Sequence, residues 1–219
     1  MIYIIGCGGV GSWLAEAMVR LVKKENLILV DGDVLEEKNL DRQLFTPEMI
    51  GRNKADALAG KLDCESRPEW YAHNTIAHRG ADWLMCCVDN SPARREVLTA
   101  CDLHGCSGIF AANEVTSSEA YLYLPQFRDK VDADPRKYYP ETMADNSNNP
   151  AARSIGCTGV AQENNRQLVT ANFMAAALAA HLYVVWALES RKLKSESMKH
   201  LPTRLFQNLT KSGSVFANR

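Results

Sequence analysis

The apolar positions of this chain form two kinds of pattern that alternate along the sequence. Short, unbroken apolar runs occur at residues 2–5, 27–30 and 83–88. Such runs are typical of parallel strands that are buried on both faces. Apolar residues spaced three and four positions apart, as on one helix face, occur at residues 12–24, 52–62 and 92–103. The alternation predicts βαβ crossovers and an α/β fold with a doubly wound, mostly parallel sheet and helices on both faces.

The second half of the chain continues this pattern with one interruption. Further strands are predicted at 69–72, 108–112 and 120–124, and a long helix at 166–191. Residues 125–153 hold four prolines and many charges, which predicts a long flexible crossover loop of the kind that is often functional. The polar C-terminal tail at 197–219 is expected to add a strand or to cover a sheet edge. We expect a single domain over residues 1–219.

Composition narrows the possible classes of protein. The 219 residues, 46% of them hydrophobic, suffice for one substantial core. A formal net charge of −1 provides no field for nucleic acid or an anionic membrane. The uninterrupted apolar runs are too short to span a bilayer, and Met1 leads directly into the first strand without room for a signal peptide. Seven cysteines without a secretory signal or a Cys-x-x-Cys pair predict free thiols in a reducing cytoplasm and disfavour a structural zinc site.

Candidate chemistry begins directly after the first predicted strand. Residues 6–12 read Gly-Cys-Gly-Gly-Val-Gly-Ser, which fits a G-x-G-x-x-G turn between a strand and a helix. Glycines allow a tight turn and a close approach to phosphate, and the helix N-terminus offers free N–H groups. Asp31 follows Gly11 by twenty residues, where a carboxylate meets a ribose hydroxyl in dinucleotide folds. The motif predicts a nucleotide site in a Rossmann-like fold and fits NAD as well as ATP.

A second set of polar residues distinguishes between these nucleotides. Asp31-Gly32-Asp33 is followed by Asn39-Leu40-Asp41-Arg42-Gln43, then by Lys54 and by Asp89-Asn90. Together with the glycine run, these spaced elements resemble the pattern of the ubiquitin-activating-enzyme superfamily, which includes the bacterial ThiF and MoeB proteins. The resemblance covers residues 1–125 closely and the region around Cys157 loosely.

The resemblance implies ATP-dependent adenylation of the C-terminal glycine carboxylate of a ubiquitin-like or sulfur-carrier protein. Asp31 would hold the ribose, Arg42 and Lys54 would stabilise phosphoryl charge as catalytic residues, and Asp89 would coordinate Mg²⁺. Asp33 would lie near the phosphates or the metal. The implied cofactors are therefore ATP and Mg²⁺. The residues implied to bind the nucleotide are Gly6, Gly8, Gly9, Gly11, Ser12, Asp31, Asp33, Asn39, Arg42, Gln43, Lys54 and Asn90.

Ordinary structural roles remain open for the same residues. Arg42 could pair with Glu36 or Glu37 on a solvated loop. Lys54 could be an exposed helix lysine, and Asn90 could serve only as the N-cap of the next helix. The family pattern favours the functional roles over these.

Cys157 is the candidate acyl acceptor. It lies after the predicted loop and before the long helix, where several family members carry an acyl-accepting cysteine. Gly156 and Gly159 allow mobility there, and Arg153 would favour the thiolate. We expect the acyl group to pass from AMP to Cys157 as a thioester; the alternative is a small buried residue at a helix start. The other six cysteines are more typical of core positions.

The chain resembles a minimal version of the family. Several relatives have an N-terminal arm with an arginine that reaches a partner subunit, zinc-binding Cys-x-x-Cys pairs or further domains, none of which is expected here. It is most similar to stand-alone bacterial or phage-type ThiF proteins, including those of the PRTRC plasmid system. The expected partners are a carrier protein ending in glycine, a second copy of the chain as a homodimer, and a conjugating enzyme or sulfur donor. No membrane or direct nucleic-acid partner is expected.

Other functions compete with this prediction. An NAD-dependent oxidoreductase would use the same glycine run, but it leaves Arg42, Gln43, Lys54 and Asp89 unexplained. A ThiF-like enzyme that activates a small carboxylate on tRNA is a variant of the first function. A non-catalytic binding subunit would have no need of the charged residues.

Overall fold

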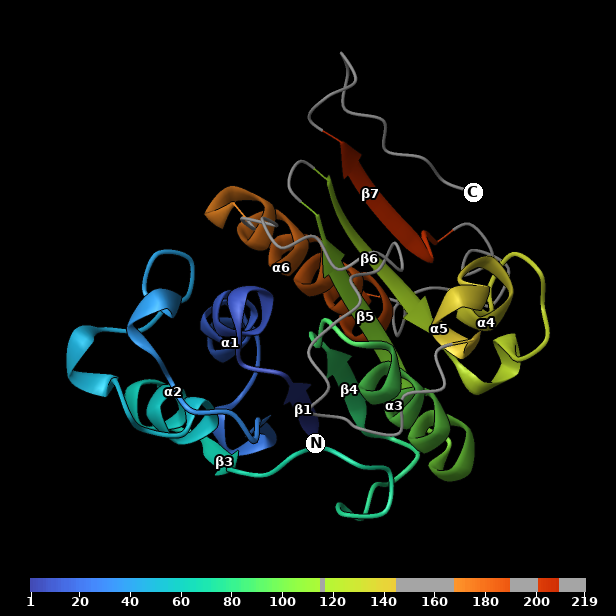
Figure 1. Ribbon diagram of the computed structural model, residues 1–219. Coiled ribbons are helices and arrows are strands. Elements are labelled where there is room, and N and C mark those ends of the chain that lie inside the picture. Colours follow the sequence, from blue (N-terminus) through green and yellow to red (C-terminus); the bar gives the residue numbers. More distant parts are fainter. Residues whose placement is uncertain (115–116, 145–167, 190–200, 209–219) are drawn as a thin grey trace.

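A seven-stranded sheet runs through the molecule in the order β3-β2-β1-β4-β5-β6-β7 (Figure 1). This computed structural model describes residues 1–114, 117–144, 168–189 and 201–208. The strands are β1 (Ile2–Ile5), β2 (Leu27–Val30), β3 (Glu65–Arg67), β4 (Trp83–Cys86), β5 (Ser107–Asn113), β6 (Ser117–Tyr123) and β7 (Arg204–Asn208). Strands β3, β2, β1, β4 and β5 run parallel to one another, whereas β6 is antiparallel to β5 and β7 is antiparallel to β6. The predicted mostly parallel sheet is confirmed, and the C-terminal tail adds a strand.

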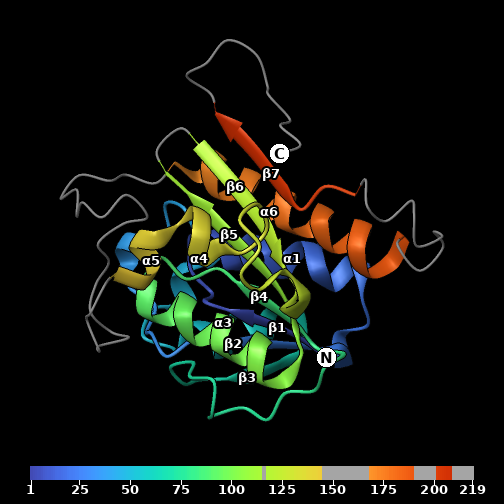
Figure 2. The same ribbon diagram turned by 90° about the vertical axis from the view of Figure 1, so that its right-hand side faces the viewer.

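Helices cover both faces of this sheet, as predicted (Figures 1 and 2). The α-helices are α1 (Gly9–Leu21), α2 (Lys54–Leu62), α3 (Ser91–His104), α4 (Pro135–Tyr138), α5 (Pro140–Ala144) and α6 (Val169–Tyr183). A π-helix (Val184–Glu189) continues α6. Helices α1, α2 and α6 lie on one side of the sheet, and α3, α4 and α5 lie on the other.

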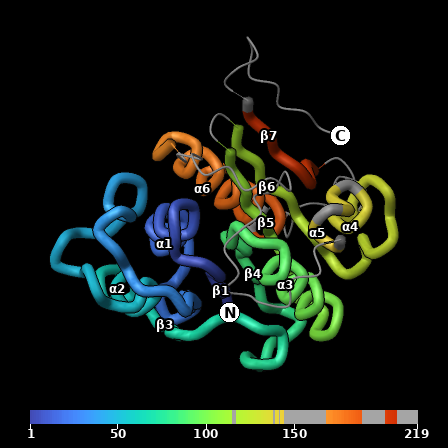
Figure 3. The backbone as a smooth tube through the Cα atoms, viewed as in Figure 1, coloured from blue at the N-terminus to red at the C-terminus, as the bar shows by residue number. Residues whose placement is uncertain are grey.

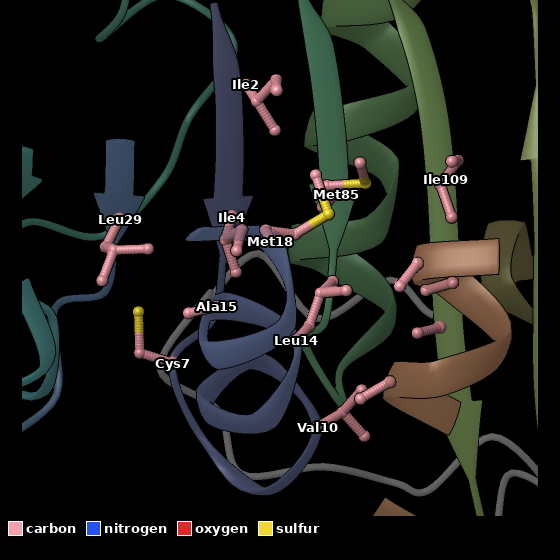
Figure 4. Close-up of a cluster of buried hydrophobic side chains, with 14 of the residues drawn as sticks. Ile2, Ile4, Cys7, Val10, Leu14, Ala15, Met18, Leu29, Met85 and Ile109 are labelled. Atoms are coloured by element: carbon pink, nitrogen blue, oxygen red, sulfur yellow. The ribbon is translucent and has the colours of Figure 1, made fainter. Parts of the chain in front are cut away.

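The unbroken apolar strands are explained by two cores, one on each face. Successive side chains of a strand point to opposite faces. Ile4 of β1 therefore packs with Leu14 and Met18 of α1 (Figure 4). Ile5 points the other way and packs in a second cluster with Val97 of α3. Because both faces are buried, no polar residue alternates with the apolar ones.

Some boundaries differ from the predicted ones. The strand expected at 69–72 is wrong, because β3 ends at Arg67 and Pro68 lacks the N–H that a further ladder bond needs. The first helix begins at Gly9, so the second half of the glycine run is itself helical.

The prediction of a loop without secondary structure at 125–153 is wrong for the described part of that segment, which contains short helices. A 3₁₀-helix (Pro125–Phe127) is followed by α4 and α5, and each of the three begins with a proline. Proline is favoured in the first turn of a helix, where its missing N–H costs nothing. Asp134 caps α4 by accepting a hydrogen bond from the Arg136 N–H at 3.0 Å. Residues 145–153 lie outside the described residues.

One described segment corrects the expectation about apolar length. Val169–Ala187 is long and apolar enough, by length and composition alone, to cross a membrane, and 50% of the tested window is buried inside the fold. Its first part, α6, contacts α1, β5 and β6. Trp13 of α1 stacks on Phe173 of α6 with 3.9 Å between the ring centroids. These contacts are those of a helix that covers the core of a sheet.

The path of the chain creates a switch point at the centre of the sheet (Figure 3). From β1 the chain moves through β2 to β3 on one side, and then through β4 to the other side. In open α/β sheets, ligands bind outside the carboxyl ends of the strands at such a point. The glycine run follows β1, and Asp89 follows β4. The fold therefore brings the two predicted parts of the site to one crevice.

Candidate functional site

The glycine run forms a tight turn between β1 and α1. Gly6 has a φ of 89°, in the left-handed region that favours glycine. A Cβ at Gly11 would lie 1.8 Å from the Gly6 carbonyl oxygen, so any side chain there would force the turn open. Gly8 is the N-cap of α1, and no described side chain caps this helix. The first N–H groups of α1 are therefore available to an anion, as in phosphate-binding loops.

Asp31, at the end of β2, is held by the backbone of two segments. Its Oδ2 accepts a hydrogen bond from the Cys7 N–H at 2.6 Å, and its Oδ1 accepts one from the Asp33 N–H at 2.8 Å. Asn53, the N-cap of α2, donates from Nδ2 to the Asp31 carbonyl at 2.8 Å. The carboxylate therefore has a fixed orientation beside the glycine run. Asn53 was missed by the sequence analysis, although its place just before a helix was a capping signal.

The ionisation of Asp31 is shaped by its burial. Desolvation raises the pKa of the Asp31 carboxyl above its usual value of 3.8, although its two backbone N–H partners and Lys54 act in the opposite direction. New hydrogen-bond donors from a ligand would stabilise the ionised form. The group is therefore suited to accept hydrogen bonds from ribose hydroxyls.

Lys54 is a buried cation and not the exposed helix lysine of the ordinary interpretation. Lys54 is 7% exposed, and its Nζ lies 2.5 Å from Oδ2 of Asp33. The Lys54 N–H also donates to the Asp33 carbonyl at 2.9 Å. A lysine ammonium has three donors. The pairing therefore positions the cation while leaving donors for a phosphate.

Arg42 lies on the loop between β2 and α2. Its Nη1 donates to the Lys38 carbonyl and to Oδ1 of Asp41, both at 2.9 Å. The alternative pairing with Glu36 or Glu37 is therefore not the one in the structure. Both described bonds use one nitrogen of the planar guanidinium, whose fork geometry suits phosphate oxygens.

The main chain of Arg42 is anchored from two helices. Trp13 Nε1 donates to the Arg42 carbonyl at 3.1 Å, and Asn172 Nδ2 of α6 lies 3.5 Å from the same oxygen. Asn172 is fully buried, and a Cβ at Gly9 would lie 2.6 Å from its Nδ2. One side chain of α6 thus contacts both the glycine run and the arginine loop. Asn172 was missed, although a lone amide in an apolar helix was a signal.

Two buried oxygens beside the glycine run have no hydrogen-bond partner among the described residues: Gln43 Oε1 and Asn172 Oδ1. Gln43 is 7% exposed, and its Nε2 would lie 3.7 Å from a Cβ at Gly8. An unpartnered buried polar atom costs about 1–3 kcal/mol. The Gln43 amide, turned by 180°, presents its NH₂ group, which can donate a hydrogen bond to a phosphate oxygen. Asn172 keeps its Nδ2 toward the Arg42 carbonyl. The surroundings of the glycine run therefore fit a nucleotide.

Three further predicted residues have roles inside the fold. Asn39 Oδ1 accepts from the Glu36 N–H at 3.0 Å and holds the arginine loop. Ser12 is fully buried, and its Oγ accepts from the Leu44 N–H at 3.1 Å. Asn90 Oδ1 caps α3. A contact of these side chains with a nucleotide stays a prediction.

Asp89 is exposed at the carboxyl end of β4, where it lines a cavity of about 620 Å³. Arg94 of α3, Asn113 of β5 and Ser118 of β6 contribute further polar walls. Arg94 is buried and donates to the carbonyls of Val88 and Ala111 at 3.1 and 3.3 Å. The cavity therefore extends from the switch point over the antiparallel part of the sheet.

A polar cluster around the buried Glu119 closes the far wall of this cavity. Glu119 accepts hydrogen bonds from the Tyr139 hydroxyl and from Arg204 Nε, and Arg204 Nη2 donates to the Tyr139 oxygen at 2.6 Å. Burial and the neighbouring Glu119 carboxylate raise the pKa of Tyr139, which keeps the phenol a neutral donor. The sequence analysis missed this cluster, because its three members lie on separate elements without common spacing.

The donor set suits Mg²⁺ held together with a nucleotide. Nowhere in the described ranges do three His, Cys, Asp or Glu side chains gather as a possible metal site. Mg²⁺ usually takes one or two carboxylates and completes its shell with phosphates and water. Asp89 supplies one exposed carboxylate at the switch point. The residues therefore fit a shared site.

The described cysteines are poor nucleophiles. Burial raises the pKa of the Cys7 and Cys101 thiols, and it raises the pKa of Cys64 and of Cys106 to about 11. A raised pKa leaves little reactive thiolate. The described free cysteines are Cys7, Cys64, Cys86, Cys87, Cys101 and Cys106, of which all but Cys64 and Cys87 are buried. Cys157 lies outside the described residues.

Comparison with known protein sequences places these motifs in context. A model of the ThiF family matches residues 1–213. The ubiquitin-like modifier-activating enzyme 5 of Drosophila persimilis is 32% identical over 120 residues, which cover 45% of this chain and 31% of the relative. The same enzyme of Branchiostoma floridae is 33% identical over 123 residues, which cover 47% and 30%. The matched segments span less than a third of these curated relatives.

Solved structures share the fold at low sequence identity. E. coli MccB with succinimide has a TM-score of 0.68 and 17% identity, covering 99% of this chain and 63% of that one. MccB with AMPCPP and MccA has a TM-score of 0.69 and 19% identity, with the same coverage of 99% and 63%. The protein PaaA has a TM-score of 0.62 and 17% identity, covering 98% and 62%. The seven-stranded architecture is therefore one that these proteins share.

Proposed function

From the premise that the chain belongs to the ThiF family, we propose that it adenylates the C-terminal glycine carboxylate of a ubiquitin-like or sulfur-carrier protein with ATP. One arrangement carries the proposal: the glycine turn follows β1, Asp31 and the Lys54–Asp33 pair lie after β2, and Asp89 follows β4, all at the carboxyl edge of the parallel strands. Asp89 also lines a cavity. An oxidoreductase with the same glycine turn would not need this set of charges.

The sites divide between the two substrates. The crevice would take the nucleotide, with Asp31 accepting the ribose hydroxyls and the N-terminal N–H groups of α1 binding phosphate. The cavity of about 620 Å³ beyond Asp89 would take the end of an acyl substrate. MccB, a solved neighbour, has been crystallised with AMPCPP and MccA together, and this supports a shared site for a nucleotide and a second substrate.

The reaction joins two anions, and this decides which side chains it needs. A carboxylate oxygen of the carrier attacks the α-phosphorus, the bond to the β-phosphate oxygen breaks, and pyrophosphate leaves with the electron pair. The transition state spreads negative charge over the phosphoryl oxygens and the leaving pyrophosphate. Lys54 and Arg42 would stabilise that charge, each worth about 10²–10³ in rate by analogy with other fixed donors. Bound Mg²⁺ would supply further positive charge, with Asp89 as its protein ligand.

A thioester step is the finer part of the proposal. The thiol of Cys157 would attack the acyl carbon of the adenylate, AMP would leave, and the thiol proton would pass to solvent. The raised pKa of Cys64 and Cys106, about 11 in each, disfavours them as acceptors. A Cys157→Ala variant should keep pyrophosphate exchange and lose any adduct that a reducing thiol cleaves.

A thermal-shift experiment tests the nucleotide part first. Wild type and Arg42→Ala are each melted with Mg-ATP and with NAD. Mg-ATP should stabilise wild type by about 2.7 kcal/mol at a hundredfold excess over Kd. NAD should have no such effect, and Arg42→Ala should respond less to Mg-ATP.

Stabilisation by NAD alone would replace the proposal with the oxidoreductase alternative. Once ATP binding is measured, exchange of labelled pyrophosphate into ATP is assayed with small glycine-ending proteins encoded near the gene. Exchange without any protein, driven instead by a tRNA carrying a small carboxylate, would favour the tRNA-acting variant. The homodimer and the downstream conjugating enzyme or sulfur donor stay predictions, which a sedimentation measurement and an acyl-transfer assay can address.

A further inference from the structure

Trp70 is an exposed aromatic side chain on the loop after β3, beside the acidic turn that follows β2. It is 49% exposed, which is unusual for the largest apolar side chain. No ring or cation in the described part of the chain stacks on it. Neither of the two hydrophobic clusters includes it. The fold therefore gives Trp70 little reason to be a tryptophan.

The indole lies flat against Gly32. A Cβ at Gly32 would lie 2.5, 2.6 and 2.7 Å from Cδ2, Cγ and Cε2 of Trp70. Three nearly equal distances to atoms of the five-membered ring mean that the face of the ring, and not its edge, covers Gly32. Gly32 stands between Asp31 and Asp33. The aromatic plane thus lies against the residue that directly follows Asp31, the residue that we assign to the ribose.

The order of the strands places Trp70 where the base would lie. Phosphates bind at the switch point between β1 and β4, and the ribose meets the acid after β2. The next strand outward is β3, which pairs with β2 (Figure 2). Trp70 follows β3 by three residues, and the Asp31 N–H donates to the Arg67 carbonyl at 3.3 Å. Phosphate, ribose and base would therefore run from β1 outward to β3.

We propose that Trp70 is the stacking platform for the adenine base of the bound nucleotide. This inference rests on the proposed function, because it needs ATP as a substrate. Every nucleobase has a π-face, so stacking adds affinity without choosing strongly between bases. The glycine at position 32 leaves room for the indole of Trp70. Any larger residue there would displace the indole from the ribose site.

Intrinsic fluorescence of wild type, Trp70→Ala and Trp70→Phe tests the proposal, with ATP and with inorganic tripolyphosphate as probes. Adenine stacking should quench tryptophan emission when ATP binds, and tripolyphosphate should not quench it. Trp70→Ala should bind ATP about 5- to 150-fold more weakly, whereas tripolyphosphate affinity, measured calorimetrically, should stay within twofold. Trp70→Phe should recover part of the loss. Leu103→Ala, which removes an apolar side chain that is 65% exposed on α3, is the matched control.

The possible results distinguish a failure of the stacking role of Trp70 from a failure of the proposed adenylating function. Equal loss of ATP and tripolyphosphate affinity would mean that Trp70 only supports the turn, and would overturn the inference. Unchanged ATP affinity in Trp70→Ala, with normal binding by wild type, would overturn it and leave the adenylating function intact. No ATP binding by wild type would refute the proposed function itself.

Discussion

Around β1 and β2, polar side chains are fixed mainly by backbone groups, whereas around β6 and β7 they are fixed by one another. Asp31 accepts from two backbone N–H groups, and its own carbonyl accepts from Asn53. On the antiparallel side, Glu119, Tyr139 and Arg204 bind each other across the cavity wall. The first arrangement joins neighbouring segments of the parallel half, whose partners are at most 24 positions apart. The second depends on segments that meet only when the sheet is complete.

Substitutions in the two regions should therefore have different effects, one on nucleotide binding and chemistry and the other on stability or the acyl substrate. Changes near β1 and β2 should alter nucleotide binding and chemistry at nearly constant stability, unless they deform the turn. Changes near β6 and β7 should alter stability, or the acyl substrate, and leave the nucleotide site as it is.

Lys54→Ala should lower the adenylation rate by about 10²–10³-fold, because it removes a fixed cation from the phosphate site. Pyrophosphate exchange with a functional carrier measures the loss. Lys61→Ala, in the same helix but exposed, is the control and should react like wild type. Near-normal exchange by a folded Lys54→Ala protein would remove the lysine from the catalytic set.

Gly11→Ala should slow adenylation by about 100-fold, since a misplacement of about 1 Å in a reacting group has that effect. The new Cβ would lie 1.8 Å from the Gly6 oxygen, so the turn must move. Gly60→Ala is the matched control in α2, where the nearest atom to a new Cβ is an Arg52 side-chain nitrogen at 3.6 Å. That control should stabilise the protein by about 0.4–1 kcal/mol in a denaturant titration. An active Gly11→Ala enzyme would contradict the tight turn.

Glu119→Gln should reduce the free energy of unfolding by about 1–3 kcal/mol, because it weakens a buried charge-assisted cluster. ATP affinity should stay unchanged, since none of the three cluster members touches the glycine turn. Glu114→Gln, which is exposed and lines the same cavity, should change stability by less than about 0.5 kcal/mol. A fall in ATP affinity for Glu119→Gln would show that the two halves are coupled.

The pH dependence of ATP binding should show the raised pKa of Asp31. Ribose hydroxyls bind the ionised carboxylate better, so affinity should fall as the pH drops, beginning above the value of 3.8 that is usual for an aspartate. Asp31→Asn should lack this component and show only the protonation of ATP itself. The effect on folding has the opposite sign, because the folded state holds its proton more tightly. Between the unfolded and the folded pKa, Asp31 should therefore lower stability as the pH rises, by less than about 1.4 kcal/mol per pH unit. Parallel curves for both proteins would contradict the raised pKa.

Much of the parallel half could be predicted from the sequence, because its information is local. The unbroken run at Ile2–Ile5 and the glycines after it specify strand, turn and helix within a few residues. The predicted strand at 69–72 failed because its aromatic residues lie on a loop after β3: Trp70 is exposed, and Tyr71 packs in the second hydrophobic cluster without joining the strand ladder. Pro68, directly before this segment, lacks a backbone N–H and already argued against a strand there.

The antiparallel half could be predicted as strands but not as a site. Glu119 and Arg204 are 85 positions apart, and no spacing rule connects them. Asn172 was equally hidden, since its role depends on α6 packing over the glycine run. Such contacts depend on how distant segments pack in three dimensions, and the local spacing of residues in one sequence does not predict that packing.

The packing of α6 against α1 has a consequence for how the protein is made. The central strand β1 and helix α1 leave the ribosome well before α6, but the Trp13–Phe173 stack that covers α1 needs residues that are synthesised much later. At about 5–20 residues per second, that delay is on the order of ten seconds. Through this interval the nascent chain exposes the apolar face of α1 that α6 later covers. We expect a chaperone to bind that face. We expect translation pauses between residues 21 and 169 to change the yield of folded protein more than pauses after α6.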